Sequence, residues 1–95
     1  MKFAAIIEYI QNPAKVDEIR PIHRQYQSDL KEAGKLVVWG PFVDGSGALI
    51  VFESNSKEEV ESMLRHDPFA QHGVFVSWVV RPWNVVNANR NLLPG

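Results

Sequence analysis

The stretch LVVWGPFVDGSGALIVF, residues 36–52, decides the fold of this 95-residue chain. Its two ends, residues 36–42 and 48–52, are short apolar runs typical of strands. Between them DGSG, residues 44–47, contains an Asp-Gly pair suited to a hairpin turn. We therefore expect two neighbouring strands that pair antiparallel in the middle of the chain.

A strand and then a helix are expected before this hairpin. Residues 2–10 (KFAAIIEYI) are too few for a typical helix and precede the breaker pair Asn12-Pro13. Residues 16–33 have helical periodicity, and Gly34 supplies a stop. The apolar stripe of this helix contains Ile19, Ile22, Tyr26, Leu30 and Ala33, whereas Arg20, Arg24, Gln27 and Lys31 fall on another side.

A second helix and a fourth strand are expected after the hairpin. Ser56 and Glu59 have the spacing of a capping box. The inner stripe of the helix that they begin contains Val60, Met63 and Leu64. HDPFAQHG, residues 66–73, then breaks the helical pattern, and residues 74–80 (VFVSWVV) form a strand closed by Pro82.

The resulting order is strand, helix, strand, strand, helix, strand, which is the split βαβ arrangement of ferredoxin-like α+β domains. We predict one such domain over residues 1–83, with a four-stranded antiparallel sheet and two helices on one of its faces. Residues 84–95 form a polar, Asn-rich C-terminal tail.

Both faces of this sheet are predicted to be apolar. The alternating sets are Leu49 and Val51 against Ala48, Ile50 and Phe52 in the third strand, and Phe75 and Val79 against Val74, Val76 and Trp78 in the fourth. Two helices cover only one face, and a large exposed apolar patch is unusual on a soluble monomer. We therefore expect a homodimer that buries the second face. Association would also stabilise a small domain that has no cysteine for disulfides.

The composition excludes several classes of protein. Hydrophobic residues make up 45% of the chain and charged residues 22%, as in soluble globular domains. Ten Lys and Arg against eleven Asp and Glu leave a net charge of −1, so the basic field of a nucleic-acid-binding protein is missing. No apolar run is long enough to span a membrane, and the N-terminal residues do not have the pattern of a signal peptide. We expect a cytoplasmic protein without a nucleic-acid or membrane partner.

Two residues are candidates for acid/base chemistry. His23 falls within the inward-facing arc of the first helix, and Asp67 lies on the inner side of the second helix where Pro68 ends it. Taken singly, His23 fits a core histidine bonded to a backbone carbonyl, and Asp67 fits a helix cap. Taken together, they lie on helices packed on one sheet face and approach each other. A carboxylate beside an imidazole fixes its tautomer, as a general acid or base requires.

The remaining polar residues have simpler interpretations. His66 suits the carbonyl end of the second helix, and His72 is expected at the surface. Without an HExxH pattern, a cysteine or an i, i+4 histidine pair, we predict neither a metal nor another cofactor. The amides of residues 44–47 suit an anion, but a hairpin turn accounts for them. Trp39, Phe42, Trp78 and Trp83 belong to the core or an interface, unless one lines a ligand cleft.

Three segments together resemble one family. They are RPIHRQY (residues 20–26), GPFVDGSGALIVFE (residues 40–53) and DPFAQHGVF (residues 67–75), with RPW (residues 81–83) after them. The chain up to Trp83 is similar to the YciI-like proteins of the dimeric α+β barrel superfamily. The resemblance implies a ferredoxin-like fold, a dimer through the sheet face, and an active site that contains His23 and Asp67.

The resemblance also implies a small-molecule enzyme, with lyase or isomerase chemistry on cyclic or aromatic metabolites suggested by neighbouring families. On this hypothesis His23 is the acid or base and Asp67 orients it. The cleft wall then contains Tyr26, Gly40, Pro41, Phe42, Asp44, Gly45 and Ser46. The alternative is a dimeric ligand-binding or sensor module without turnover. RNA binding is disfavoured, because the third strand (ALIVF) lacks the basic and aromatic residues of an RNA-recognition motif.

Overall fold

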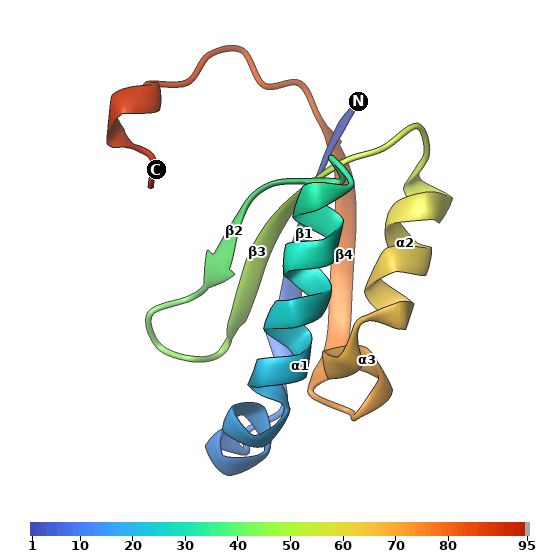
Figure 1. Ribbon diagram of the computed structural model, residues 1–95, viewed down its shortest axis with the longest axis vertical. Helices are drawn as coiled ribbons and strands as arrows, with labels where there is room; N and C mark the ends of the chain where they lie inside the picture. Colours follow the sequence, from blue (N-terminus) through green and yellow to red (C-terminus); the bar gives the residue numbers. More distant parts are fainter. Residues whose placement is uncertain (95) are drawn as a thin grey trace.

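The computed structural model describes residues 1–94; Gly95, the last residue of the predicted tail, lies outside them. The elements in chain order are β1 (Lys2–Tyr9), α1 (Pro13–Glu32), β2 (Leu36–Pro41), β3 (Gly47–Glu53), α2 (Lys57–His66), α3 (Pro68–Gln71), β4 (Phe75–Trp83) and the 3-10 helix η1 (Arg90–Leu92) (Figure 1). The strands form one antiparallel sheet in the order β2-β3-β1-β4. This confirms the ferredoxin-like α+β fold and the central hairpin.

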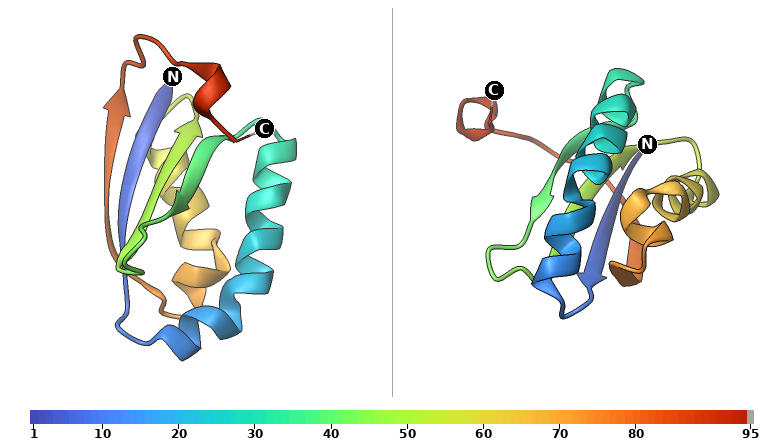
Figure 2. Two further views of the ribbon diagram at one scale, coloured as in Figure 1. Left: turned by 90° about the vertical axis from the view of Figure 1, so that its left-hand side faces the viewer. Right: turned by 60° about the horizontal axis from the view of Figure 1, so that its bottom comes forward.

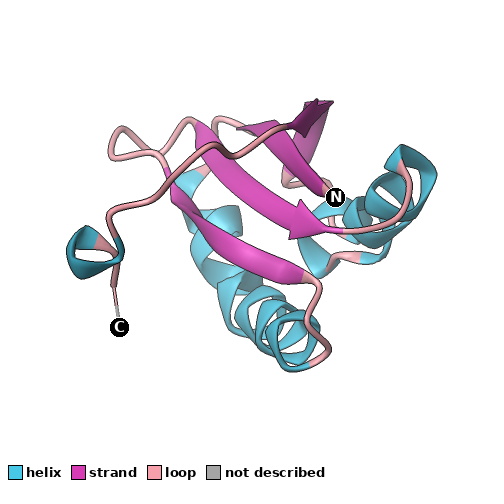
Figure 3. Ribbon diagram, turned by 90° about the horizontal axis from the view of Figure 1, so that it is seen from above, coloured by secondary structure: helices cyan, strands magenta, loops and turns pink. Residues whose placement is uncertain are grey.

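The molecule has two layers. Figure 2 shows α1, α2 and α3 on one face of the sheet, and Figure 3 shows the same separation from above, with the strands over the helices. The C-terminal segment leaves the end of β4 and carries η1 away from the sheet (Figure 1). No helix of the described chain is both long and apolar enough to cross a membrane.

The core lies between the two layers and is centred on β1. Four alternate residues of this strand are buried on the helix side: Phe3, Ala5, Ile7 and Tyr9. In β3 their cross-strand partners Ala48, Ile50 and Phe52 are buried as well. Val60 and Leu64 of α2 pack into this core from the helix layer, as their spacing predicted. The central strands thus bury one full set of side chains, which is the main apolar contribution to stability.

Helix α1 differs from its predicted form at two points. It begins at Pro13, because the Asn12 side chain accepts a hydrogen bond from the Lys15 backbone N–H and proline suits the first helical position. Its buried stripe also contains an unexpected residue. Gln27 was placed on the polar side but is buried, whereas Ile22, placed inside, is half exposed. Apolar spacing alone misplaces the stripe, because it cannot recognise a buried amide.

Strand β4 does not alternate as expected. Phe75 and Val79 were assigned to one face, but Phe75 is buried opposite Tyr9 while Val79 is exposed. The register between β1 and β4 shifts at Glu8 and Tyr9. An irregularity of this kind inserts an extra residue and inverts the facing of the residues beyond it. It is the feature that turns the Phe75 ring towards the helices.

The second face of the sheet is apolar and uncovered by helices. We define the outer sheet face by Ile6, Val38, Leu49 and Val79. Ile6 of β1 pairs with Leu49 of β3 and Val79 of β4, whereas Val38 of β2 pairs with Val51, a buried residue two positions along β3 from Leu49. All four side chains are exposed. The expectation that both faces carry apolar residues is confirmed.

Gly47 is required at the start of β3, where the strand closely approaches β1. A Cβ at this position would lie 1.8 Å from the backbone oxygen of Ile7. We predict that Gly47→Ala lowers the free energy of unfolding by about 3 kcal/mol or more, since backbone atoms must move. Gly40→Ala is the control, because a Cβ there meets nothing within 4 Å. Urea denaturation measures both, and equal stabilities for the two variants would contradict this account.

Candidate active site

His23 and Asp67 form a buried hydrogen-bonded pair. The His23 Nδ1 lies 2.7 Å from the Asp67 Oδ1, and the two residues are 5% and 3% exposed. Asp67 ends α2 and caps α3, because the same Oδ1 accepts a hydrogen bond from the Phe69 backbone N–H at 2.8 Å. The expected approach of the two side chains is confirmed. Asp67 is at once a helix cap and the partner of the imidazole.

The hydrogen bond determines which nitrogen of His23 faces outward. An ionised carboxylate only accepts hydrogen bonds, so Nδ1 carries the proton and Nε2 keeps its lone pair. Nε2 has no hydrogen-bond partner within residues 1–94, and every fully buried side-chain nitrogen or oxygen there has one. Nε2 is therefore not sealed in the core. Asp67 thus holds the imidazole at Nδ1, while Nε2, the basic nitrogen, is left accessible.

Phe69 fixes the plane of the imidazole. The two rings are stacked, with centroids 3.7 Å apart and an angle of 7° between their planes. The Phe75 ring is edge-on to His23, with a centroid distance of 6.1 Å. Asp67 and Phe69 belong to one short turn, so the DPF segment supplies both the hydrogen-bond acceptor and the stacking surface. Sequence reasoning missed Phe69. Its only signal is its position two residues after the capping carboxylate.

His23 lines a cleft between α1 and β2. This α1–β2 cleft has a volume of about 370 Å³ and is lined by His23 with Gly40 and Pro41 of β2, two of the predicted wall residues. Gln27 of α1 and Tyr9 of β1 also line it. Because α1 and β2 form its walls, the cleft opens on the helix side of the sheet, away from the outer sheet face.

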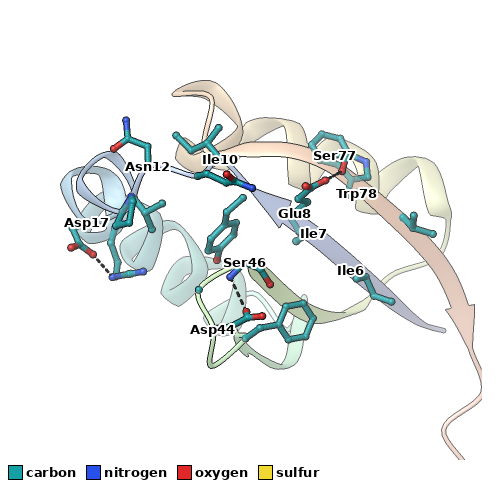
Figure 4. Close-up of a pocket in the computed structure, with 18 residues that line it drawn as sticks. Ile6, Ile7, Glu8, Ile10, Asn12, Asp17, Asp44, Ser46, Ser77 and Trp78 are labelled. Carbon is teal, nitrogen blue, oxygen red and sulfur yellow. Dashed lines mark hydrogen bonds and ion pairs between the residues drawn. The ribbon is translucent and has the colours of Figure 1, made fainter.

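Four of the other predicted wall residues surround a different hollow. Phe42, Asp44, Gly45 and Ser46 line a space of about 810 Å³ beside the β2–β3 turn. Figure 4 shows Asp44 and Ser46 on one side of this hollow and Asp17 on another. Tyr9 and Arg20 line both spaces.

Hydrogen bonds inside the β2–β3 turn occupy its backbone amides. The Gly45 N–H donates to the Phe42 carbonyl and the Ser46 N–H to the Asp44 carboxylate, each at 2.9 Å. The hydrogen bonds from Ser46 lower the pKa of Asp44. Two of the amides considered for anion binding thus serve the turn itself.

Tyr26 and two histidines lie elsewhere. The Tyr26 hydroxyl donates to the Met63 carbonyl at 2.7 Å and joins α1 to α2, and the residue is not among those lining either hollow. His66 Nδ1 lies 2.7 Å from the Ser62 carbonyl oxygen at the end of α2, and His72 is exposed, both as expected. Among residues 1–94 no three His, Cys, Asp or Glu side chains are grouped as metal ligands.

Tyr9 is a cleft residue that the sequence did not reveal. It lies in an apolar strand, where a tyrosine is most simply a core residue. Its hydroxyl has no hydrogen-bond partner in the described chain, and since no sealed polar atom lacks one, it opens towards the hollows. Burial raises the pKa of Tyr9 to about 12, and the positive charge of Arg20 lowers this pKa by a smaller amount. The phenol therefore stays protonated at physiological pH and is available as a hydrogen-bond donor.

The fold and the site define an α+β ferredoxin-like protein with a buried His–Asp pair beside a small cleft. The model of the YCII-related domain matches residues 1–84, and the chain belongs to this family. The resemblance seen in the sequence is thereby confirmed.

Individual proteins are similar over most of the chain. A protein from Emericella nidulans, "derivative of benzaldehyde biosynthesis cluster protein C", is 30% identical over 81 residues, which cover 67% of this chain and 83% of that protein. The 5-chloro-2-hydroxyhydroquinone dehydrochlorinase from Burkholderia phenoliruptrix, solved with 2,5-dihydroxybenzoquinone, is 26% identical with a TM-score of 0.78 over 88% of this chain and 94% of that one. Muconolactone isomerase, 13% identical with a TM-score of 0.61 over 100% and 98%, shares the fold.

The buried phenols predict alkaline sensitivity. Burial raises the pKa values of Tyr9 and Tyr26, the only tyrosines, from 10.0 to about 12. Since folding favours the neutral phenols, their contribution to stability is complete below pH 10 and is lost as the pH rises towards 12. Absorbance at 295 nm should show tyrosinate near pH 12 in the folded protein and near pH 10 in urea. A folded-state midpoint near 10 would contradict the effect of burial on the two tyrosines.

Proposed function

We propose that this protein is a small-molecule enzyme of lyase or isomerase type, in which His23 is the general acid or base and Asp67 is its orienting carboxylate. One observation carries the proposal: His23, hydrogen-bonded to Asp67 through Nδ1 at 2.7 Å and without a partner at Nε2 within residues 1–94, lines the α1–β2 cleft. This is the arrangement that a histidine needs to exchange protons with a substrate.

The proposed chemistry begins with a proton transfer to His23. Nε2 takes a proton from carbon or oxygen of the substrate, and the electron pair of the broken bond forms a new double bond. In a lyase, a leaving group departs with its own bonding pair. In an isomerase, the imidazolium returns the proton at another atom. Asp67 stabilises the imidazolium through Nδ1, and neither route needs an oxidant or a reductant.

The size of the cleft and the similar dehydrochlorinase favour an oxygenated ring as substrate. A volume of about 370 Å³ is within the range of small-molecule sites. The dehydrochlorinase binds 2,5-dihydroxybenzoquinone, a six-membered ring that carries four oxygens. Tyr9 supplies a neutral hydroxyl donor for such a ligand, and Trp39 of β2 lines the same cleft.

We also propose a homodimer that buries the outer sheet face. Exposed apolar side chains from all four strands gather on this face, opposite the helices. Contact between two such faces removes them from water, which is the dominant favourable term in association. The α1–β2 cleft stays accessible, since it opens on the helix side. The cytoplasmic location expected from the sequence stays a prediction.

Replacement of His23 by Asn tests the catalytic assignment. We expect His23→Asn to keep the fold and lower turnover by about 10²-fold or more, because an amide cannot exchange a proton near neutral pH. Asp67→Asn acts in the same direction, since it removes the charge that holds the tautomer. A substrate is first sought by ligand-induced thermal shifts with small aromatic and lactone compounds.

Two results decide between the alternatives. His23→Asn with wild-type turnover of the identified substrate would remove His23 from the mechanism. Saturable binding without any product would instead favour the ligand-binding or sensor module. Circular dichroism and melting temperature of each variant establish that a loss of turnover is not a loss of fold.

The dimer is tested with a matched pair of substitutions. Ile6 on the outer sheet face and Ile22 on α1 are 51% and 50% exposed. Light scattering of the wild-type chain should give twice the monomer mass of 10.8 kDa. Ile6→Lys should shift the protein to monomer by burying charge in the interface, whereas Ile22→Lys should leave the dimer intact. A wild-type monomer at micromolar concentration would contradict the proposal.

A further inference from the structure

Gln27 is an unpartnered amide at the wall of the α1–β2 cleft. It lies one helical turn after His23, on the same side of α1, and is only 8% exposed. Its side chain makes no hydrogen bond within residues 1–94, although a primary amide offers two donors and one acceptor oxygen. Because no sealed polar atom of the described chain lacks a partner, this amide opens into the cleft that it lines.

A purely structural role does not explain Gln27. An apolar residue of similar size would extend the buried stripe of Val16 and Ile19, whereas the Gln27 amide has no protein partner within residues 1–94 and lies at the cleft. Polar groups without a protein partner beside a cleft are typical of functional sites, where the partner is a ligand.

The rim of the same cleft is cationic. Arg20, Arg24 and Lys31 line it, and no Asp or Glu is among its lining residues. Arg20 is paired with Asp17 at 2.7 Å, whereas Arg24 and Lys31 make no ion pair within residues 1–94. This excess of positive charge is local, since the whole chain has a net charge of −1. A concave site lined by one sign of charge attracts ligands of the other sign.

We propose that the α1–β2 cleft takes an anionic ring substrate, with an ionised hydroxyl or carboxyl oxygen bound by the Gln27 amide and neutralised by Arg24. The two residues are three apart on α1 and therefore neighbours, and Gln27 is four from His23. One face of the helix thus carries the amide, the cation and the basic nitrogen. This assignment rests on the proposed function and names the class of substrate for it.

The probes are two quinones and a simple aromatic acid. 2,5-Dihydroxybenzoquinone is an acidic enol that is ionised at neutral pH, and its dimethyl ether keeps the ring without charge or donors. Benzoate offers a carboxyl oxygen. Calorimetry with the wild-type protein should show binding of at least one anion, weakened by salt, and at least about 10-fold weaker binding of the ether. Equal affinity for the ether, or no binding of either anion, would overturn the anionic class.

Two substitutions separate binding from folding. Gln27→Glu keeps the size of the side chain but sets a negative charge against the anion, so its affinity should fall by at least about 10-fold. Gln27→Leu should bind more weakly as well, yet melt at or above the wild-type temperature, because it removes an unpartnered polar group. Gln25→Glu is the control, since it adds the same charge on the exposed side of α1. Wild-type affinity in both Gln27 variants would overturn the role of Gln27.

The proposed reaction fails or stands independently of this result. His23→Asn leaves Gln27 and Arg24 in place, so it should bind the anion within a few-fold of the wild type even when turnover is lost. If the Gln27 variants lose affinity while His23→Asn turns over normally, the anion site stands and the catalytic role of His23 falls.

Discussion

The hydrogen bond between His23 and Asp67 joins three elements at one atom. Asp67 Oδ1 accepts from the Phe69 N–H that begins α3 and lies 2.7 Å from the His23 imidazole on α1. Asp67 lies at the end of α2, where Pro68 forces the chain to turn. The same turn presents the Phe69 ring against the imidazole. The junction of α1, α2 and α3 and the orientation of the histidine therefore depend on one carboxylate.

The two faces of the sheet have separate uses. On the helix side, the core surrounds a small number of polar groups that open into the α1–β2 cleft, among them His23, Gln27 and Tyr9. On the outer sheet face, exposed apolar residues offer a surface for a second copy. In the proposed dimer, this division would let association stabilise a small domain without closing the cleft.

Much of this arrangement is predictable from the sequence, because it rests on local signals. The Asp-Gly turn, the Ser56 cap and the Asp67-Pro68 break fix the element order, and with it the fold and the approach of His23 to Asp67. The predictions that were wrong concern features with non-local causes. The shift at Glu8 and Tyr9 that turns Phe75 inward depends on pairing with β1.

Residues predicted to form one cleft wall line two separate hollows, because their positions depend on contacts between distant parts of the chain. Gly40 and Pro41 line the cleft with His23, whereas the residues of the β2–β3 turn surround the other space. Gln27 and Tyr9 escaped notice because a polar residue in a buried position has no periodic signature.

The tautomer of His23 is the most direct test of the His23–Asp67 pair. Long-range ¹H–¹⁵N correlation spectra report it at a pH where the imidazole is neutral. We predict a proton on Nδ1 and a free lone pair on Nε2; a proton on Nε2 with Nδ1 unprotonated would contradict the account.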